Sequence, residues 1–155
     1  MEKYSIFMNL DEKDKRILGI LTEDSSLTTS KISKKTRIPI TTIHNRIQKL
    51  KKHRIIKSYT LNLNYEKLGR PITAYILLTV NQNLTTGKKT SQQHIAKKIK
   101  AHRYVDTVDI VTGATDMIIK VRTDSMGTLN NLLTKDLRKI DGVDKTQTMI
   151  VLEEI

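Results

Sequence analysis

The stretch Arg37-Ile-Pro-Ile-Thr-Thr-Ile-His-Asn-Arg-Ile-Gln-Lys-Leu-Lys-Lys-His-Arg-Ile-Ile-Lys-Ser-Tyr59 decides how the first part of the chain folds. Within it, apolar residues recur at steps of three, four and three: Ile40, Ile43, Ile47 and Leu50. This spacing predicts an α-helix with one apolar face. The other face is polar and basic, and it carries side chains that can hydrogen-bond base edges or pair with phosphate.

The residues before this helix predict a second helix and a tight turn. Thr28 to Thr36 opens with hydroxyl side chains that can cap a helix, and the helix is expected to last about two turns, until Ile38 and Pro39 interrupt it. Pro39 cannot donate a backbone hydrogen bond, but it suits the first turn of the next helix. Two helices joined in this way form a helix-turn-helix pattern, and Leu10 to Asp24, with Asp11 as its cap, predicts a bracing helix ahead of them.

The second helix of this pattern is therefore predicted to be a DNA recognition helix. The side chains expected to contact base edges are Thr41, Thr42, His44, Asn45 and Gln48. The side chains expected to anchor phosphates are Arg37, Arg46, Lys49 and Lys52, and Arg46 can also reach a guanine. The alternative is a purely structural helix with a solvated polar face.

The charge distribution favours a polyanionic partner. The net charge is +12, and between Ser25 and Tyr65 there are ten basic residues and no Asp or Glu. Such a one-sided block suits phosphate binding, because each neutralised phosphate releases counterions. A solvated lysine-rich surface is the alternative, but the helical phasing beneath the charge favours DNA.

Composition bounds the rest of the molecule. The chain has 155 residues, of which 37% are hydrophobic and 4% aromatic, so two modest cores are expected rather than one large core. It contains no run of about 18 apolar residues, hence no expected membrane span, and its first ten residues do not resemble a secretory signal. We expect a cytoplasmic protein. The absence of cysteine excludes disulfides and cysteine metal sites, and the high lysine and isoleucine content hints at an archaeal or thermophilic source.

The second half of the chain predicts a different architecture. A short strand is expected at 55–63 and a domain boundary at 64–71, where Gly69 and Pro71 lie. The elements that follow are a strand at 72–80, a polar loop at 81–90, a helix at 91–102, strands at 105–112 and 115–123, a helix at 125–140 and a strand at 143–152. This βαββαβ order is the ferredoxin-like arrangement. The predicted class is α+β, with a helix-turn-helix domain (winged or plain) at 1–64, a linker at 65–71 and a ferredoxin-like domain at 72–155.

Several motifs together resemble the Lrp/AsnC family, the leucine-responsive and asparagine regulators. They are Leu10-Asp11 with Asp14-x-x-Ile17-Leu18, then Ile38-x-x-Thr41-Thr42-Ile43-x-x-Arg46-Ile47-x-x-Leu50, then Ile55-Ile56-x-x-Tyr59 and Leu68-Gly69. The chain departs from the family at Pro39, where Ser or Thr is usual, and at Arg54, where Gly is usual. The resemblance implies a transcription regulator whose second domain senses a small molecule and forms a homodimer through its sheet, or a larger assembly. Two recognition helices related by a two-fold axis would read an imperfect palindrome in double-stranded DNA.

The same resemblance points to an effector loop at Val111 to Asp116. Its candidate residues are Gly113, Ala114, Thr115 and Asp116. Backbone amides at a glycine turn can hold a carboxylate, and Asp116 can pair with an α-ammonium group, so an amino acid or a related metabolite is the expected ligand. Ala114 and Thr115 replace the acidic and aromatic pair usual in the family. An ordinary hairpin turn is the alternative.

Other functional classes have weaker support. The four histidines lack metal-ligand spacing, and the glycines form neither a Walker loop nor a dinucleotide fingerprint, so we expect no catalytic residues, metal or cofactor. Sirohaem decarboxylase subunits resemble the same two-domain layout, but an enzyme would not need the acid-free basic segment. Single-strand binding is disfavoured because that segment has no aromatic residue before Tyr59. A DNA-architectural protein without an effector stays open.

Overall fold

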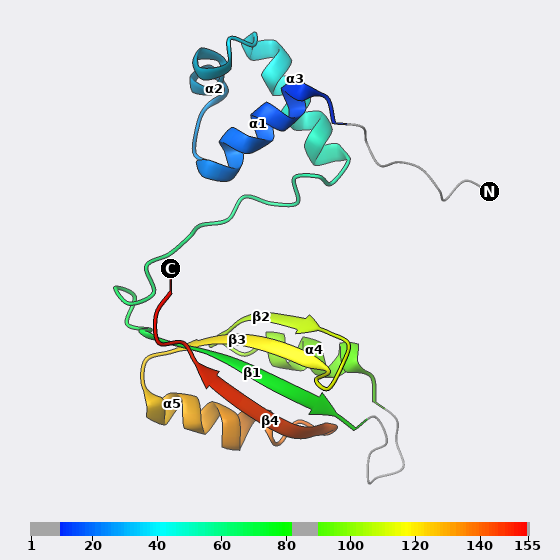
Figure 1. The fold of residues 1–155 in the computed structure, drawn as a ribbon, viewed down its shortest axis with the longest axis vertical. Coiled ribbons are helices and arrows are strands. Elements are labelled where there is room, and N and C mark those ends of the chain that lie inside the picture. Colours follow the sequence, from blue (N-terminus) through cyan, green and yellow to red (C-terminus); the bar gives the residue numbers. More distant parts are fainter. Residues whose placement is uncertain (1–9, 82–89, 155) are drawn as a thin grey trace, which may run out of the picture. The chain divides into compact units, whose positions relative to one another are not determined.

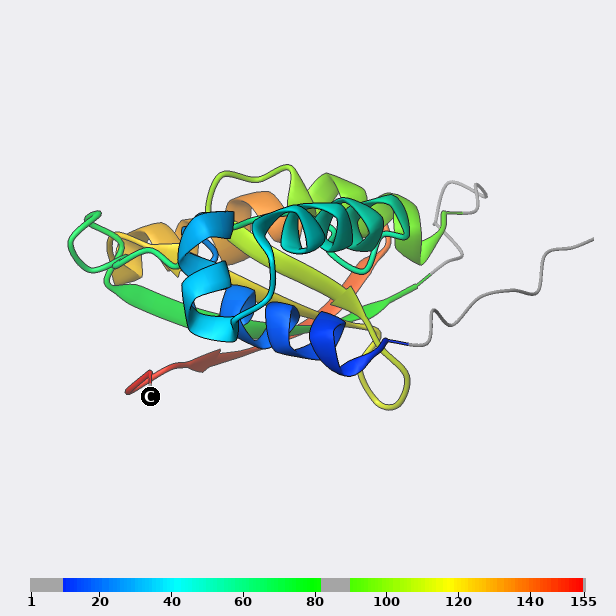
Figure 2. The same cartoon turned by 90° about the horizontal axis from the view of Figure 1, so that it is seen from above.

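The computed structural model describes residues 10–81 and 90–154. The chain forms two compact units, Met1–Asn62 and Leu63–Ile155, and each has its own hydrophobic core. In the first unit three helices lie against one another (Figures 1 and 2). In the second, helices pack on a four-stranded antiparallel sheet (Figure 1). The predicted α+β class is confirmed.

The helices of the first unit are α1 (Glu12–Glu23), α2 (Thr29–Thr36) and α3 (Ile40–Lys52). A capping box begins α1, because Asp11 accepts a hydrogen bond from the Asp14 amide at 2.9 Å and Asp14 reaches back to the Asp11 amide. Thr28 caps α2 through the Lys31 amide. No side chain caps α3, which begins after Pro39. The helix-turn-helix pattern predicted from the sequence is therefore present.

The apolar repeat of α3 supplies most, but not all, of its buried face. Ile43, Ile47 and Leu50 are buried, and Ile43 and Ile47 pack in a core with residues of α1, α2 and the turn: Ile17, Leu21, Ile32 and Ile38. Ile40 differs from the other members of the repeat, because it is 49% exposed and lies outside this core. Ile40 is also the first residue of α3, one turn before the buried Ile43.

The strand predicted at 55–63 is absent, since the described residues 10–62 contain no strand. The α3 helix instead ends with Arg54 in a left-handed conformation (φ 56°), and the Ile55 amide donates to the carbonyl of Leu50. The following residues have no strand beside them, and Tyr59 and Leu61 are exposed. An alternating pattern cannot form a strand without a partner, so residues 10–62 form a plain helix-turn-helix without a wing.

The second unit contains β1 (Ile72–Val80), α4 (Gln92–Lys100), β2 (Val105–Ile110), β3 (Met117–Thr123), α5 (Met126–Asn131) and β4 (Val143–Ile150). The strand order in the sheet is β2-β3-β1-β4, with antiparallel pairing throughout. The expected ferredoxin-like order is therefore confirmed. The single helix predicted at 125–140 is divided, because α5 continues into a π-helical turn, η1 (Leu132–Leu137). The loop predicted at 81–90 lies mostly outside the described residues.

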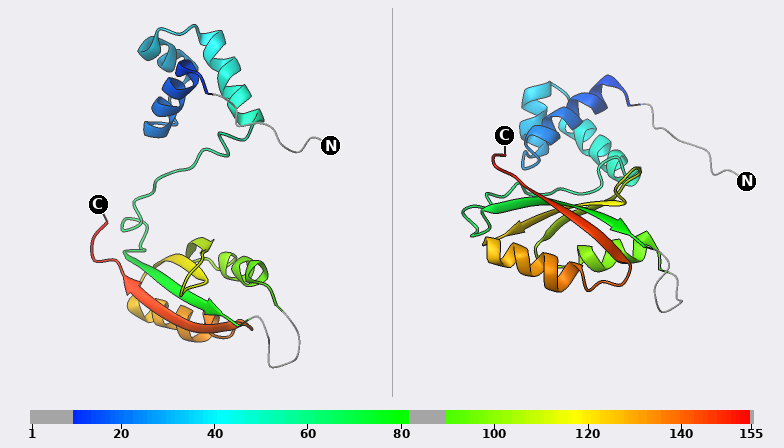
Figure 3. Two further views of the ribbon diagram at one scale, coloured as in Figure 1. Left: turned by 45° about the vertical axis from the view of Figure 1, so that its right-hand side comes forward. Right: turned by 60° about the horizontal axis from the view of Figure 1, so that its bottom comes forward.

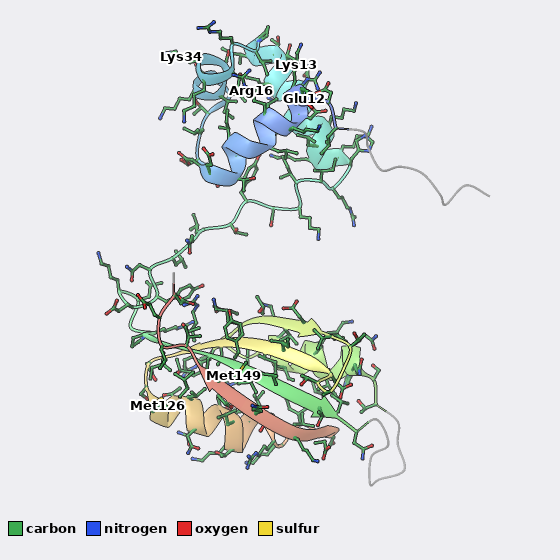
Figure 4. All side chains as sticks on the ribbon, in the orientation of Figure 1. Glu12, Lys13, Arg16, Lys34, Met126 and Met149 are labelled. Carbon is green, nitrogen blue, oxygen red and sulfur yellow. The ribbon has the colours of Figure 1, made fainter. Side chains whose placement is uncertain are left out.

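One face of this sheet is covered by α4 and α5 (Figure 3). Alternate residues of β1, namely Ala74, Ile76 and Leu78, point into the core that these helices close. The opposite face carries Tyr75 and Leu77 of β1, which pair with Met149 of β4 and Ile118 of β3 respectively. Met149 is 47% exposed on this face (Figure 4). No element in the described residues of the second unit covers this apolar surface.

Arg122 of β3 forms hydrogen bonds with residues of β1 and β2 and with Glu154, which follows β4. Its Nε lies 2.6 Å from the Asp106 carboxylate, and its Nη1 and Nη2 donate to the two oxygens of Glu154 at 2.9 and 3.0 Å. Nη1 also donates to the hydroxyl of Thr73, and the ring of Tyr65 stacks 4.0 Å from the guanidinium carbon. Burial opposes the charged form, but the hydrogen bonds to Glu154 and Asp106 outweigh it and raise the pKa of Arg122. We call these five residues the Arg122 cluster.

Candidate nucleic-acid interface and effector loop

The outward face of α3 presents hydrogen-bonding side chains in a row. Thr41, His44, Asn45 and Gln48 are exposed, whereas Thr42 is half-buried. His44 and Gln48 are four residues apart and so lie one above the other on the helix. Because Ile43, Ile47 and Leu50 hold the opposite face in the core, this row is fixed in orientation. Exposed hydroxyl, imidazole and amide groups of this kind can donate to and accept from base edges in the major groove.

The cations around this row are almost all free of acidic partners. Of the ten basic residues between Ser25 and Tyr65, only Arg46 forms an ion pair among the described residues. Lys49 and Lys52 are exposed on α3, and Arg37 is exposed at the end of α2, where its backbone is left-handed (φ 59°). These unpaired charges make a surface suited to the DNA backbone.

Arg46 has acidic partners within the first unit that the sequence did not reveal. Its Nη1 lies 2.7 Å from Asp11 and 2.8 Å from Asp14, so the guanidinium joins α3 to the beginning of α1. The hydrogen bonds that Arg46 donates to Asp14 and Asp11 raise the pKa of Arg46. The Asp14 backbone and the Arg46 side chain together lower the pKa of Asp11. The charge of Arg46 is neutralised within the unit, which argues against a phosphate contact; the pairing crosses 32 residues, so helix phasing could not reveal it.

Replacing Arg46 with Gln is therefore expected to weaken folding rather than DNA contact. Asp14 is 4% exposed, and the substitution leaves its carboxylate without a cation. We expect the free energy of unfolding to fall by about 2 kcal/mol, since a buried carboxylate loses its partner. Thermal unfolding of the full chain measures this loss.

Lys49→Gln provides the matched control on the same helix. Lys49 has no ion pair among the described residues, so its removal should change stability by less than about 0.5 kcal/mol. It should instead weaken binding to duplex DNA and reduce the salt dependence of log K by about 0.9 per lost phosphate contact. Equal stability losses in the two variants would contradict the structural role of Arg46.

A basic groove that the sequence did not reveal lies beside this interface. Its lining residues are Glu12, Lys13, Lys15 and Arg16 of α1, Thr36 of α2, and Arg37 and Ile38 of the turn, so four of the seven are cations and one is acidic. The groove has a volume of about 620 Å³. Lys13 and Arg16 come from α1, and Lys34 of α2 adds a further cation to this unit (Figure 4). Lys13 and Arg16 are three residues apart, so they are neighbours on the surface of α1. This spacing is the feature of the sequence that could have predicted a basic site on α1.

The predicted effector loop connects β2 and β3 and turns at Gly113, where φ is 118°. Gly113 and Ala114 are exposed and Thr115 is half-buried. Asp116, expected to face a ligand ammonium group, has partners inside the chain. One of its carboxylate oxygens accepts from the Val80 amide at 2.7 Å and the other from Gln92 Nε2 at 2.8 Å. Asp116 thus fixes the loop against the end of β1 and the start of α4.

Two properties of the described residues bear on function. No group of three or more His, Cys, Asp or Glu side chains is placed to hold a metal ion there. None of the helices in the described ranges has the length and hydrophobicity that crossing a membrane requires.

Comparison with known proteins gives two family matches. Residues 10–51 match the AsnC-type helix-turn-helix domain, and residues 73–155 match the Lrp/AsnC ligand binding domain. Relatives include the HTH-type transcriptional regulators PF1734 and FL11 of Pyrococcus furiosus. PF1734 is 38% identical over 146 residues, which cover 94% of this chain and 93% of that protein. FL11 is 38% identical over 144 residues, which cover 93% and 90%.

Solved structures share the fold over nearly the whole chain. The transcriptional regulator NMB0573 of Neisseria meningitidis, crystallised as an L-Met complex, has a TM-score of 0.85 at 23% identity and covers 94% of this chain and 92% of that one. The regulator PF0864 of Pyrococcus furiosus, a member of the AsnC family, has a TM-score of 0.73 at 28% identity, with coverage of 94% and 92%. Both family models and the near full-length relatives agree with the helix-turn-helix and the ferredoxin-like sheet. The chain therefore belongs to the Lrp/AsnC family of helix-turn-helix transcription regulators.

Proposed function

We propose that this regulator binds an imperfect palindrome in double-stranded DNA as a homodimer or a larger homo-oligomer, and that an amino acid or a related metabolite modulates binding. It acts by binding rather than by catalysis, and because its target is the chromosome we place it in the cytoplasm. The observation that carries the proposal is the outward face of α3, where polar side chains stand on a helix whose other face is buried.

The proposed DNA contacts follow from exposure and charge. The base-edge contacts are Thr41, Thr42, His44, Asn45 and Gln48, and the phosphate contacts are Arg37, Lys49 and Lys52. Arg46 is left out because Asp11 and Asp14 neutralise it.

Dimerisation is proposed through the uncovered face of the sheet. Tyr75, Leu77, Ile118 and Met149 form an apolar surface there, and a second copy would bury it. A two-fold axis would then place two α3 helices in successive major grooves, about 34 to 36 Å apart. This separation is why the target should be a palindrome.

The proposed effector site is the loop Gly113–Thr115. Its exposed glycine turn can offer backbone amides to a carboxylate, and Asp116 holds the loop in place. The match to a ligand binding domain over residues 73–155 supports a small-molecule ligand. The L-Met bound by NMB0573 supports an amino acid. Effector binding would shift the assembly equilibrium and so the affinity for DNA.

The test is selection of bound fragments from genomic DNA at two salt concentrations, with and without a pool of amino acids. We expect enrichment of a palindrome whose occupancy changes with the pool. Enrichment that ignores the pool would remove the effector. Binding without sequence preference, with affinity that collapses as salt rises, would indicate a DNA-architectural protein instead.

Asn45→Ala is expected to relax sequence discrimination at one base pair of the selected site. An Asn amide can hydrogen-bond an adenine at two points, so its loss should cost about 1 to 3 kcal/mol of discrimination there. Affinities for the site and for its single-base variants measure the effect. A uniform loss for every variant would show that Asn45 does not read a base.

A further inference from the structure

We infer that Ile40 reads the methyl group of a thymine in the DNA target. This inference rests on the proposed function and names one determinant of its specificity. Ile40 is the first residue of α3 and is 49% exposed, although it continues the apolar repeat that is otherwise buried. It lies outside the hydrophobic core of its unit.

The position of Ile40 on the helix aligns it with the hydrogen-bonding row. His44 and Gln48 follow it at intervals of four residues, so the three side chains lie along one face. N-terminal residues of a recognition helix are the ones that contact base edges in helix-turn-helix complexes. Ile40 thus brings an apolar group to the place where bases are read.

The chemistry of the major groove offers one apolar feature, the C5-methyl group of thymine. An isoleucine cannot hydrogen-bond a base or pair with phosphate, so contact with a thymine methyl is the recognition open to it. The neighbouring residues argue against an apolar protein partner, because the exposed cation Arg37 and the exposed polar residues Thr41 and His44 lie within four residues of Ile40 along the chain. A polyanion that presents methyl groups, which is duplex DNA containing thymine, matches this mixture.

The test uses uracil, which pairs as thymine does but lacks the methyl group. In the strongest fragment from the genomic selection, each thymine is replaced singly by uracil, and Kd is measured for the full-length wild type and for Ile40→Ala. At one thymine position in each half-site, we expect uracil to weaken wild-type binding about three- to tenfold, the range that burial of one methyl group supports. Ile40→Ala should bind the thymine fragment more weakly by a similar factor and should not distinguish thymine from uracil there.

Two further variants keep the test specific. Ile40→Val retains a branched apolar side chain and should keep most of the uracil sensitivity. Leu61→Ala removes an apolar side chain that is 82% exposed and lies outside α3, so it should leave the uracil sensitivity unchanged. Uracil effects that are the same in wild type and Ile40→Ala at every position would overturn the inference while leaving the regulator intact. Failure to enrich any preferred fragment would contradict the proposed function, and the thymine contact with it.

Discussion

Arg122→Met should lower the free energy of unfolding of the second unit by about 3 kcal/mol, because it leaves the carboxylates of Asp106 and Glu154 without their buried cation. The Arg122 side chain is 11% exposed and that of Asp106 is 20% exposed, so solvent replaces the lost ion pair poorly. Thr73, which is buried, also loses the donor to its hydroxyl. Methionine keeps much of the side-chain volume, which confines the change to charge and hydrogen bonding. Chemical denaturation of the full chain, followed by circular dichroism, measures the loss.

Lys120→Met is the control for this substitution. Lys120 also forms an ion pair with Glu154, with its Nζ 3.0 Å from a carboxylate oxygen, but the Glu154 side chain is 48% exposed. Among the described residues, Lys120 has no second acidic partner. Removing it should cost less than about 1 kcal/mol, as is usual for ion pairs open to solvent. Comparable losses in the two variants would show that the Arg122 cluster contributes no more than an ordinary surface pair.

Gly142→Ala should destabilise the same unit by about 3 kcal/mol through two effects that add. Gly142 precedes β4 with φ at 95°, a conformation that alanine adopts only with strain. A Cβ placed there would also lie 2.8 Å from methyl groups of Ile95 and Thr90, and 3.2 Å from the carbonyl oxygen of Asn81. Ile95 is fully buried and cannot move aside without disturbing the core. The midpoint of thermal unfolding should fall accordingly.

Gly113→Ala separates the two effects, because Gly113 has a positive φ of 118° but no atom within 4 Å of the site of its Cβ. Only backbone strain remains, with an expected cost of about 1 kcal/mol. If both alanine variants were equally stable, the packing around Gly142 would be looser than the distances indicate.

Local patterns predicted most of the fold because the determinants are local. Asp11 with Asp14 and Thr28 with Lys31 set helix starts within one turn of chain, and the alternation of Ala74, Ile76 and Leu78 marks the core face of β1. The prediction of a strand at 55–63 was wrong because a strand also needs a neighbouring strand to pair with. The local alternation of apolar residues cannot show whether such a neighbour exists. The π-helical turn at Leu132–Leu137 likewise has no signal in apolar spacing.

The candidate site was predictable as a surface but not residue by residue. Charge and phasing identified the exposed face of α3, yet they could not show that Arg46 bonds to Asp11 and Asp14, which are more than 30 residues away. Nor could they show that the Asp116 carboxylate accepts hydrogen bonds from the Val80 amide and from the Gln92 side chain. In both cases a side chain of the right type for a ligand has partners within the chain, and only the distances show them.

Arg37 and Arg54 both combine a strained, left-handed backbone with an exposed positive charge. They stand on either side of α3 at positive φ, where a residue with a side chain costs about 1 kcal/mol and glycine costs none. The chain thus places an exposed cation at each end of α3, although the backbone at both positions is strained.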